Sequence, residues 1–212
     1  MDKYIITLGR EFGSGGREIA AKLSENLGIK YYDKEIIEIA AEDSGYVKEL
    51  FENHDEKRDI TFGGSDMASH GIPFTSFYYL GDTLNADTLF RHKMDTIKKL
   101  AEKGSCIFVG RCADYVLRDE KNLIKVFITC NDMEKRKQRV LSRHPEITEK
   151  QVENYIKRTD RKRADYYSFY TDNEWGSAKN YDIIVDTAAF GIDGAADVIV
   201  AAVKEKLAQN ND

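Results

Sequence analysis

The stretch Tyr4-Ile-Ile-Thr-Leu-Gly-Arg-Glu-Phe-Gly-Ser-Gly-Gly-Arg17 decides the fold of this chain. Residues 4–9 form a short apolar run rich in β-branched side chains, which is typical of a buried strand. From residue 17 to residue 27 the apolar side chains recur at helical spacing, and Gly28 stands where such a helix ends. The chain therefore opens with a strand, a glycine-rich loop and a helix.

The alternation of strand and helix patterns continues to the end of the chain. Further strand-like runs cover residues 29–33, 106–110, 123–129 and 181–186. Helical patterns cover residues 34–42, 82–103, 133–144, 148–166 and 193–207. Thr148 stands three residues before Gln151, which is the spacing of a helix capping box. Strands separated by helices predict an α/β fold with a five-stranded parallel sheet and helices on both of its faces.

Bulk composition argues against several classes of protein. Hydrophobic residues make up 42% and charged residues 33% of the 212 residues, as in a globular domain with a buried core. The net charge of -5 argues against binding of nucleic acid through overall charge. No apolar run approaches the roughly 20 residues of a membrane helix, and the N-terminus lacks the layout of a signal peptide. Three cysteines without CxxC spacing predict reduced thiols and a cytoplasmic location, with Cys106 and Cys130 buried in apolar runs.

The glycine-rich loop predicts an anion site. Its glycines let the backbone curl so that several N–H groups face one anion, and the N-terminus of the following helix adds a favourable dipole. The residues expected to bind phosphate are Gly13, Ser14, Gly15, Gly16, Arg17 and Glu18. A tight turn that binds no ligand is the alternative.

Two residues of this loop depart from the usual Walker A pattern. When the loop is aligned on Gly16, Arg17 replaces the usual lysine, and Glu18 replaces the serine or threonine that touches Mg²⁺. Arginine can clamp a phosphate with two donors. Glu18 must either help to hold the metal or point away, because a free carboxylate would repel phosphate. Glu18 is therefore the candidate metal ligand.

Four motifs along the chain match one family. They are Gly13-Ser-Gly-Gly-Arg17 after the first strand, Tyr32-Asp33 after the second, Gly110-Arg111 after the third, and the span from Arg136-Lys-Gln-Arg139 to Asp160-Arg-Lys-Arg163. With these motifs, residues 4 to 200 resemble the cytidylate kinase-like branch of the nucleoside monophosphate kinases. Gly110-Arg111 is similar to the Gly-Arg-Asp that grips the acceptor phosphate in cytidylate kinases, although Cys112 replaces the aspartate.

The resemblance implies a three-layer P-loop NTPase fold and transfer of a phosphoryl group from ATP, with Mg²⁺, to a nucleoside monophosphate such as CMP or dCMP. We expect one P-loop kinase domain over residues 1–212, with a core of residues 1–42, 82–145 and 180–212. Residues 43–81, where periodicity is lost, are expected to form an acceptor-side insertion, and residues 146–179 a helical lid. A nucleotide-binding relative without turnover and a kinase of another small molecule are the alternatives.

The expected roles of individual residues follow from the negative charge that spreads over a transferred phosphoryl group. Residues 134–163 hold eleven lysines and arginines against five acids, which suits a lid that closes over phosphates. The candidates are Arg17, Arg158 and Arg163 for catalysis, Asp33, Arg111 and Asp160 for the acceptor, and Arg136, Arg139 and Arg161 for nucleotide contacts from the lid. A solvated helix face is the alternative reading of the basic run.

Asp33 and Arg111 each end a predicted strand, where ligands of open α/β sheets bind. We expect the strand of Asp33 to adjoin the strand that leads into the glycine loop. A structural salt bridge is the alternative for Arg111, and a helix N-cap is the alternative for Asp33. Five aromatic side chains either stack on a base or pack the lid against the core. They are Tyr166, Tyr167, Phe169, Tyr170 and Trp175.

Overall fold

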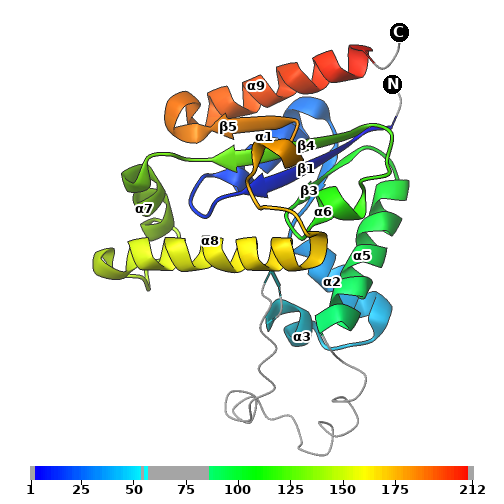
Figure 1. Cartoon of the computed structure of the whole chain (residues 1–212), viewed down its shortest axis with the longest axis horizontal. Coiled ribbons are helices and arrows are strands. Elements are labelled where there is room, and N and C mark those ends of the chain that lie inside the picture. The colour runs from blue at the N-terminus through cyan, green and yellow to red at the C-terminus, as the bar shows by residue number, and fades with distance from the viewer. Residues whose placement is uncertain (1–2, 54, 57–85, 210–212) are drawn as a thin grey trace, which may run out of the picture.

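A five-stranded parallel sheet forms the centre of the molecule (Figure 1). The computed structural model describes residues 3–53, 55–56 and 86–209. The strands are β1 (Ile5–Arg10), β2 (Lys30–Tyr32), β3 (Cys106–Val109), β4 (Leu123–Thr129) and β5 (Ile183–Asp186). They lie in the order β2-β3-β1-β4-β5, and every neighbouring pair is parallel. The predicted α/β fold is confirmed.

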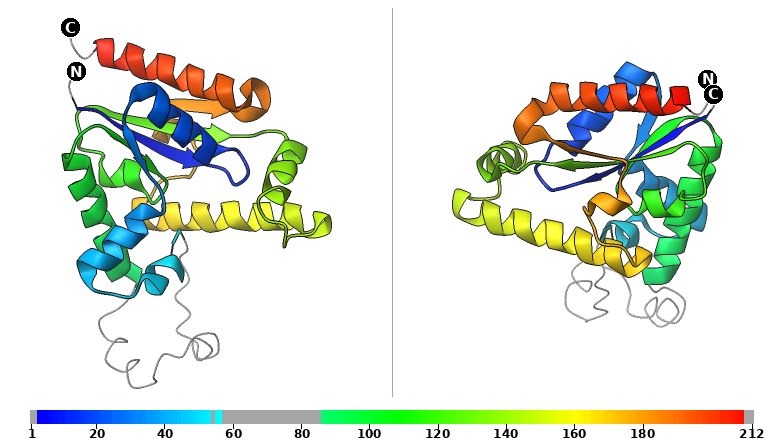
Figure 2. Two further views of the ribbon diagram at one scale, coloured as in Figure 1. Left: turned by 180° about the vertical axis from the view of Figure 1, so that it is seen from behind. Right: turned by 45° about the horizontal axis from the view of Figure 1, so that its top comes forward.

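Helices cover both faces of the sheet (Figure 2). The described helices are α1 (Gly16–Leu27), α2 (Glu35–Ser44), α3 (Lys48–Asn53), α5 (Ala86–Glu102), α6 (Ala113–Val116), α7 (Met133–Leu141), α8 (Glu149–Thr171) and α9 (Thr187–Gln209). α1 and α9 pack on one face, and α2, α5 and α6 pack on the other. α8 runs below the sheet in Figure 1, next to α7.

The alternation of side chains along each strand divides the core into two layers. Ile6 of β1 is fully buried in a cluster with Ile19 of α1 and Ile199 of α9. Its neighbour Ile5 faces the opposite side, in a cluster with Ile97 of α5. Because both faces of the sheet are covered, its strands read as nearly continuous apolar runs.

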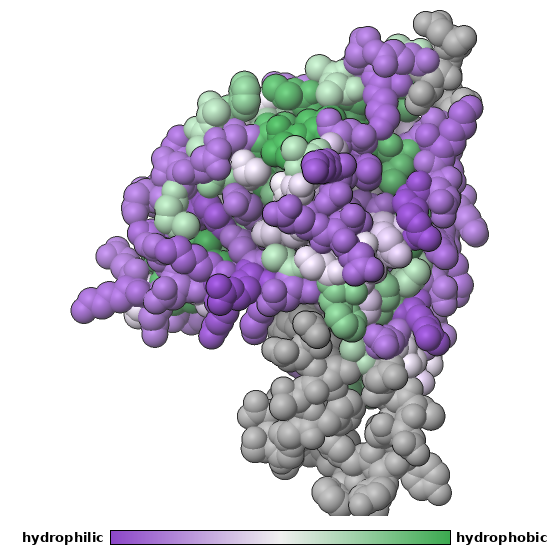
Figure 3. Space-filling model, viewed as in Figure 1, coloured by the Kyte–Doolittle hydropathy of each residue, from purple (hydrophilic) through white to green (hydrophobic). Residues whose placement is uncertain are grey.

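One face of the molecule is mainly hydrophilic, apart from an apolar area beside α9 and over β5 (Figure 3). β5 is an edge strand, and its Ile184 is 41% exposed. Phe190 and Val198 of α9 are also exposed.

The end of α8 and the start of α9 differ from the sequence prediction. α8 runs to Thr171, beyond the predicted end near residue 166, because Tyr166 and Tyr167 are buried in its last turns. α9 begins at residue 187 rather than 193 and is kinked at Gly191, whose φ is 68°. The capping box at the start of α8 is confirmed: its N-cap residue and the glutamine three residues later bond reciprocally.

The predicted insertion at residues 43–81 falls only partly within the described residues. α2 continues to Ser44, and α3 follows with Phe51 fully buried near Leu89 of α5. The helix expected from residue 82 begins at Ala86 in the described part of the chain. Residue 54 and residues 57–85 lie outside it.

The position of β2 corrects one expectation. β3 lies between β1 and β2, since Ile107 of β3 pairs with Ile6 on one side and Tyr31 on the other. The strand that precedes Asp33 therefore does not adjoin β1. The cysteines behave as expected, because Cys106 and Cys130 are buried and free.

Candidate active site

The glycine loop between β1 and α1 requires glycine at two positions. Gly13 and Gly15 have φ angles of 79° and 88°, in the left-handed region. A Cβ on Gly13 would lie 3.0 Å from the carbonyl oxygen of Arg136, and a Cβ on Gly15 would lie 2.2 Å from Ile192 Cδ1. The N–H of Ile19 donates to the carbonyl oxygen of Gly15 at 3.0 Å. The earlier N–H groups of α1 have no helical partner and suit an anion.

Two arginines of α7 hold the carbonyl side of this loop. Arg139 Nη1 donates to the carbonyl oxygen of Gly13 at 2.5 Å. Arg136 Nε donates to the carbonyl oxygen of Phe12 at 2.8 Å. The structure thus brings the predicted nucleotide-binding Arg136 and Arg139 to the loop, and backbone contacts set their positions.

A cleft of about 220 Å³ opens beside the loop. Six cationic side chains line it: Arg10, Arg17, Lys34, Arg139, Arg143 and Arg163. Glu11 is the one carboxylate among the lining residues that the structure describes, and burial raises its pKa. Such an excess of positive charge fits a polyanionic ligand. We call this space the loop cleft.

Asp160 of α8 ties the long helix to the glycine loop. Its Oδ1 accepts a hydrogen bond from the N–H of Phe12 at 2.7 Å, and its Oδ2 pairs with the buried Arg136. The sequence predicts that Asp160 binds the acceptor, whereas its contacts in the structure are with the loop and with Arg136. The carboxylate thereby sets the distance between α8 and the end of β1.

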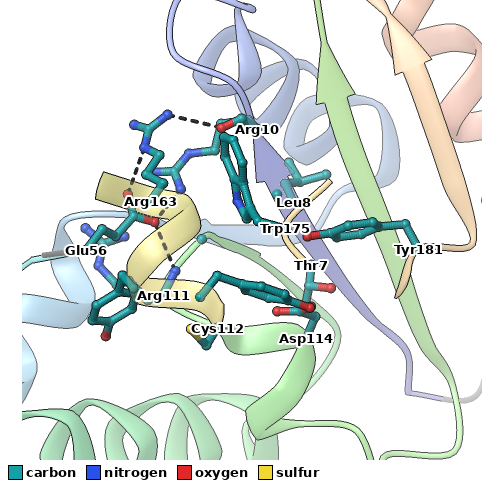
Figure 4. Close-up of a pocket in the computed structure, with 14 residues that line it drawn as sticks. Thr7, Leu8, Arg10, Glu56, Arg111, Cys112, Asp114, Arg163, Trp175 and Tyr181 are labelled. Carbon is teal, nitrogen blue, oxygen red and sulfur yellow. Dashed lines mark hydrogen bonds and ion pairs between the residues drawn. The ribbon is translucent and has the colours of Figure 1, made fainter. Parts of the chain in front are cut away.

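A second group of arginines surrounds the carboxylate of Glu56 (Figure 4). Glu56 Oε1 accepts from Arg10 Nη1 at 2.5 Å and from the backbone N–H of Arg111 at 3.1 Å. Glu56 Oε2 accepts from Arg163 Nε at 3.2 Å. Arg163 Nη1 also donates to the carbonyl oxygen of Arg10 at 3.1 Å. We call these four residues the strand-end cluster, because Arg10 ends β1 and Arg111 follows β3.

Asp33 connects the two regions. Its Oδ1 accepts from Arg111 Nη1 at 2.9 Å, and its Oδ2 accepts from Arg17 Nε at 2.5 Å. The Arg111 side chain is 1% exposed and also pairs with Asp55 at 2.8 Å. The Arg17 side chain is 53% exposed and lines the loop cleft. Asp33 is not the N-cap of α2, which is Lys34, and its carboxylate instead positions two arginines.

The charges of the strand-end cluster stabilise one another. Burial alone would raise the pKa of Glu56, but Arg10, Arg163 and Arg111 lower it well below its ordinary range. Burial would lower the pKa of Arg111, but Asp55, Glu56 and other carboxylates raise it. Arg163 differs, because burial and then the charge of Arg10 lower its pKa to about 10. The site therefore disfavours the charge that Arg163 carries.

Two predicted lid arginines are not brought to the site. Arg158 is exposed, and its guanidinium lies 5.6 Å from the ring centre of Tyr155. Arg161 is exposed and has no ion pair with any described residue. Successive residues of a helix are rotated by about 100°, so Asp160 and Arg163 face the loop while Arg158 and Arg161 point away.

Most of the predicted aromatic residues pack against the core, whereas Phe169 of α8 is exposed. Tyr166 and Tyr167 are buried in a cluster with Phe90 of α5. Tyr170 stacks on Phe90 with ring centres 3.8 Å apart. Trp175 meets Phe127 of β4 edge to face. These contacts fit the packing alternative rather than base stacking.

Three charged residues of the site, Arg10, Glu56 and Asp55, are not among those that the sequence predicts. Arg10 ends β1, and its place directly after an apolar strand is a signal that could have identified it. Glu56 and Asp55 have no such signal, since only the fold places them beside Arg111. Nearby Lys93 of α5 is 2% exposed and donates to the hydroxyl of Tyr166, and burial lowers its pKa to about 8.

Two carboxylates beside the first turn of α1 fit a role in holding Mg²⁺. Glu18 lies in that turn and pairs with Arg143, while Asp33 is held by arginines. Mg²⁺ commonly takes one or two protein carboxylates together with phosphate oxygens and water. Within the described residues, no three His, Cys, Asp or Glu side chains gather as a metal site. Glu18 and Asp33 are oxygen ligands of the type that Mg²⁺ takes beside a phosphate.

A glycine loop at the head of α1, in a parallel sheet of this order with arginines converging on the strand ends, defines the P-loop kinase class. The sequence profile of the cytidylate kinase-like family matches residues 5–189, and the chain belongs to this family. A comparison with curated proteins finds no match. None of the helices in the described ranges has the length and hydropathy needed to cross a bilayer.

Solved structures agree with this fold. An uncharacterized protein from Eubacterium ventriosum ATCC 27560 is 29% identical, with a TM-score of 0.68 over 95% of this chain and 99% of its own. A shikimate kinase from Bacteroides thetaiotaomicron is 12% identical, with a TM-score of 0.55 over 96% and 99%. A gluconokinase from Sinorhizobium meliloti 1021 is 15% identical, with a TM-score of 0.53 over 98% and 95%. The two kinases support the fold alone.

Proposed function

We propose that the chain transfers the terminal phosphoryl group of ATP to a nucleoside monophosphate, with CMP and dCMP as the favoured acceptors. The observation that carries this proposal is the meeting of two cationic sites. Arg10 and Arg163 line the loop cleft, and they also line a small pocket beside Glu56 and Arg111 of the strand-end cluster. A donor phosphate on the loop and an acceptor phosphate at the strand ends would therefore share these two arginines.

Each side chain then has a role based on position and charge. The N–H groups at the start of α1 and the half-exposed Arg17 hold the phosphates of ATP. Arg163 neutralises charge on the group in transit, and Arg111 holds the acceptor. Mg²⁺, held with the help of Glu18 or Asp33, would neutralise the phosphates of the donor.

Asp33 couples donor and acceptor in this proposal. It fixes Arg17 through Nε and leaves the remaining guanidinium N–H groups free to point to the cleft. It also fixes Arg111. One carboxylate would thus set the distance between the two arginines that grip opposite substrates, and in-line transfer depends on that distance.

A kinase of another small molecule is the second candidate. Cys112, at the position of the family's aspartate, is buried and lies in a left-handed conformation with φ of 57°. The acceptor pocket therefore lacks one polar group of the family pattern. A nucleotide-binding relative without turnover is the third candidate, motivated by the Glu18–Arg143 pair. Under each reading we expect small-molecule partners, no nucleic acid and a cytoplasmic location.

A coupled ADP-release assay with ATP and Mg²⁺ tests the proposal across CMP, dCMP, UMP, AMP and GMP. Release that depends on a pyrimidine monophosphate is the expected result. If none of the five acceptors causes ADP release in a protein that binds ATP by calorimetry, the proposal is contradicted and the second or third candidate is favoured.

Arg17→Ala tests the phosphate clamp, with Arg118→Ala as the matched control. Arg118 is exposed and contacts Asp119 and Tyr115, away from the loop. We expect Arg17→Ala to lower turnover by about a hundredfold or more, as for removal of one donor to transition-state charge. Arg118→Ala should leave it unchanged. Unchanged turnover in Arg17→Ala would remove Arg17 from the site.

A further inference from the structure

The strand-end cluster is an anion site that already contains an anion. Three donors converge on the carboxylate of Glu56: two guanidinium groups, from Arg10 and Arg163, and the N–H of Arg111. The partners come from β1, from α8 and from the turn after β3. Backbone and side-chain donors from three separate elements make a built site rather than a chance surface pair.

The main chain is shaped to admit this carboxylate. Gly110 has φ of 73°, and a Cβ there would lie 2.0 Å from Arg10 Nη1 and 2.1 Å from Glu56 Oε1. The absence of a side chain at residue 110 lets the carboxylate reach the N–H of Arg111. Glu56 itself has φ of 51°, and Arg111 has φ of 58°. Non-glycine residues rarely adopt this conformation, so the arginine charges hold Glu56 in place against its backbone preference.

A second anion cannot join Glu56 in this space. The pocket lined by the cluster holds about 20 Å³, roughly enough for one water molecule. An incoming phosphate group would have to take the place of the carboxylate. The residues that face the pocket, including Arg10, Arg163 and Trp175, are visible in Figure 4.

Charge balance points to the class of anion that would replace it. The connected ion pairs join Arg10, Arg17, Arg111 and Arg163 to Asp33, Asp55 and Glu56. Without Glu56, the four arginines carry four positive charges and the two aspartates carry two negative charges, so the cluster has a net charge of +2. A phosphomonoester carries about two negative charges at neutral pH, so it would balance the cluster better than the single carboxylate does.

We propose that the Glu56 carboxylate is an internal competitor that occupies the phosphomonoester site formed by Arg10, Arg163 and the N–H of Arg111, and that it must leave before the acceptor's phosphate binds. The inference rests on the proposed function only in equating this site with the acceptor side. Glu56 thus sets how tightly the acceptor binds, and it keeps buried arginines paired in the absence of substrate.

Inorganic phosphate without ATP is the probe, and thermal unfolding and calorimetry are the readouts. Glu56→Gln retains the shape of the side chain and removes its charge. It should lower the melting temperature in phosphate-free buffer, because buried arginines lose their partner. Phosphate should then raise the melting temperature of Glu56→Gln more than that of the wild type, and bind it about tenfold or more tightly. The glycine loop is intact in both proteins, so its own response cancels in the comparison.

Two further variants test whether the phosphate response depends on Glu56 and Arg163. Asp114→Asn removes a half-buried carboxylate that accepts from the hydroxyl of Tyr167 and forms no ion pair with an arginine of the described residues. It should lower stability without any gain in the phosphate response. Adding Arg163→Ala to Glu56→Gln should abolish the gain. Should Glu56→Gln fail to fold, Glu56→Asp, which withdraws the carboxylate by one methylene, should show a smaller gain.

A phosphate response of Glu56→Gln equal to or weaker than that of the wild type would overturn the inference and make Glu56 a structural partner only. The outcome is independent of turnover. A gain in phosphate binding without activity on any monophosphate would refute the proposed function and leave the internal competitor standing. Activity on CMP without tighter phosphate binding by Glu56→Gln would support the proposed function and refute the internal competitor.

Discussion

Replacing Arg163 by methionine separates stability from function. Methionine keeps an apolar stem and removes the charge. The Arg163 side chain is 14% exposed, and its pKa falls from the ordinary 12.5 to about 10 because burial and Arg10 disfavour its charge. That fall corresponds to about 3 kcal/mol of free energy against the charged form in the folded protein.

The same substitution removes the ion pair with Glu56 Oε2, whose attraction already contributes to the pKa of Arg163, and two further favourable contacts. The hydrogen bond to the carbonyl oxygen of Arg10 contributes about 1 kcal/mol. The guanidinium also lies 5.4 Å from the ring centre of Phe12, which contributes about 0.5–1 kcal/mol. Glu56 keeps its bonds to Arg10 and to Arg111. Removing the charge of Arg163 relieves about 3 kcal/mol, and losing its contacts with the Arg10 carbonyl and Phe12 costs about 2 kcal/mol. We therefore expect the free energy of unfolding to stay the same or to rise by up to about 2 kcal/mol.

Urea unfolding followed by the fluorescence of Trp175, the single tryptophan, measures the stability of Arg163→Met. ADP release measures its activity, which should fall by about a hundredfold or more because a donor to developing charge is lost. Arg161→Met, on the exposed side of the same helix, is the control and should change stability by less than about 0.5 kcal/mol and leave turnover intact. A loss of more than about 2 kcal/mol in Arg163→Met, or unchanged turnover, would refute the reasoning.

Two further predictions concern a buried lysine and the loop. Burial lowers the pKa of Lys93 to about 8, below its ordinary 10.5. The unfolded chain therefore binds more protons between these values, and wild-type stability should gain up to about 1.4 kcal/mol per pH unit over Lys93→Met as the pH rises through this window. A constant difference in unfolding free energy would contradict this. Gly13→Ala should weaken ATP binding about tenfold or more, a loss of about 1.4 kcal/mol, because its Cβ meets the backbone of α7. Gly28 is the control position, because its φ is 65° and a Cβ there would meet no other atom. Gly28→Ala should lower stability by about 1–2 kcal/mol and leave ATP affinity unchanged. Equal ATP affinities in Gly13→Ala and Gly28→Ala would count against the loop assignment.

The elements of the sheet and the glycine loop could be predicted because their signals are local. Period-2 and period-3.6 patterns report which side chains are buried, and they do so within a single strand or helix. The glycines at residues 13 and 15 occupy left-handed positions, a requirement of the backbone itself. The capping box at the start of α8 is likewise a contact between near neighbours.

Local sequence patterns could not predict the order of the strands, or which arginines of α8 face the glycine loop. The pattern of β2 is the same whether it lies beside β1 or beside β3. The basic run contains Arg158, Arg161 and Arg163 within six residues, and its composition does not say which side of the helix meets the loop. The bond from Asp160 to the N–H of Phe12 and the burial of Tyr166 select that side.

The sequence by itself determined an α/β chain with a glycine loop at the head of its first helix, because those features depend on side chains within a few residues of one another. Only the tertiary structure decided that Glu56 lies among Arg10, Arg111 and Arg163, which are between 46 and 107 residues away along the chain. Charge attraction acts through space, so such a cluster exists only once the backbone has brought three distant elements to the same end of the sheet.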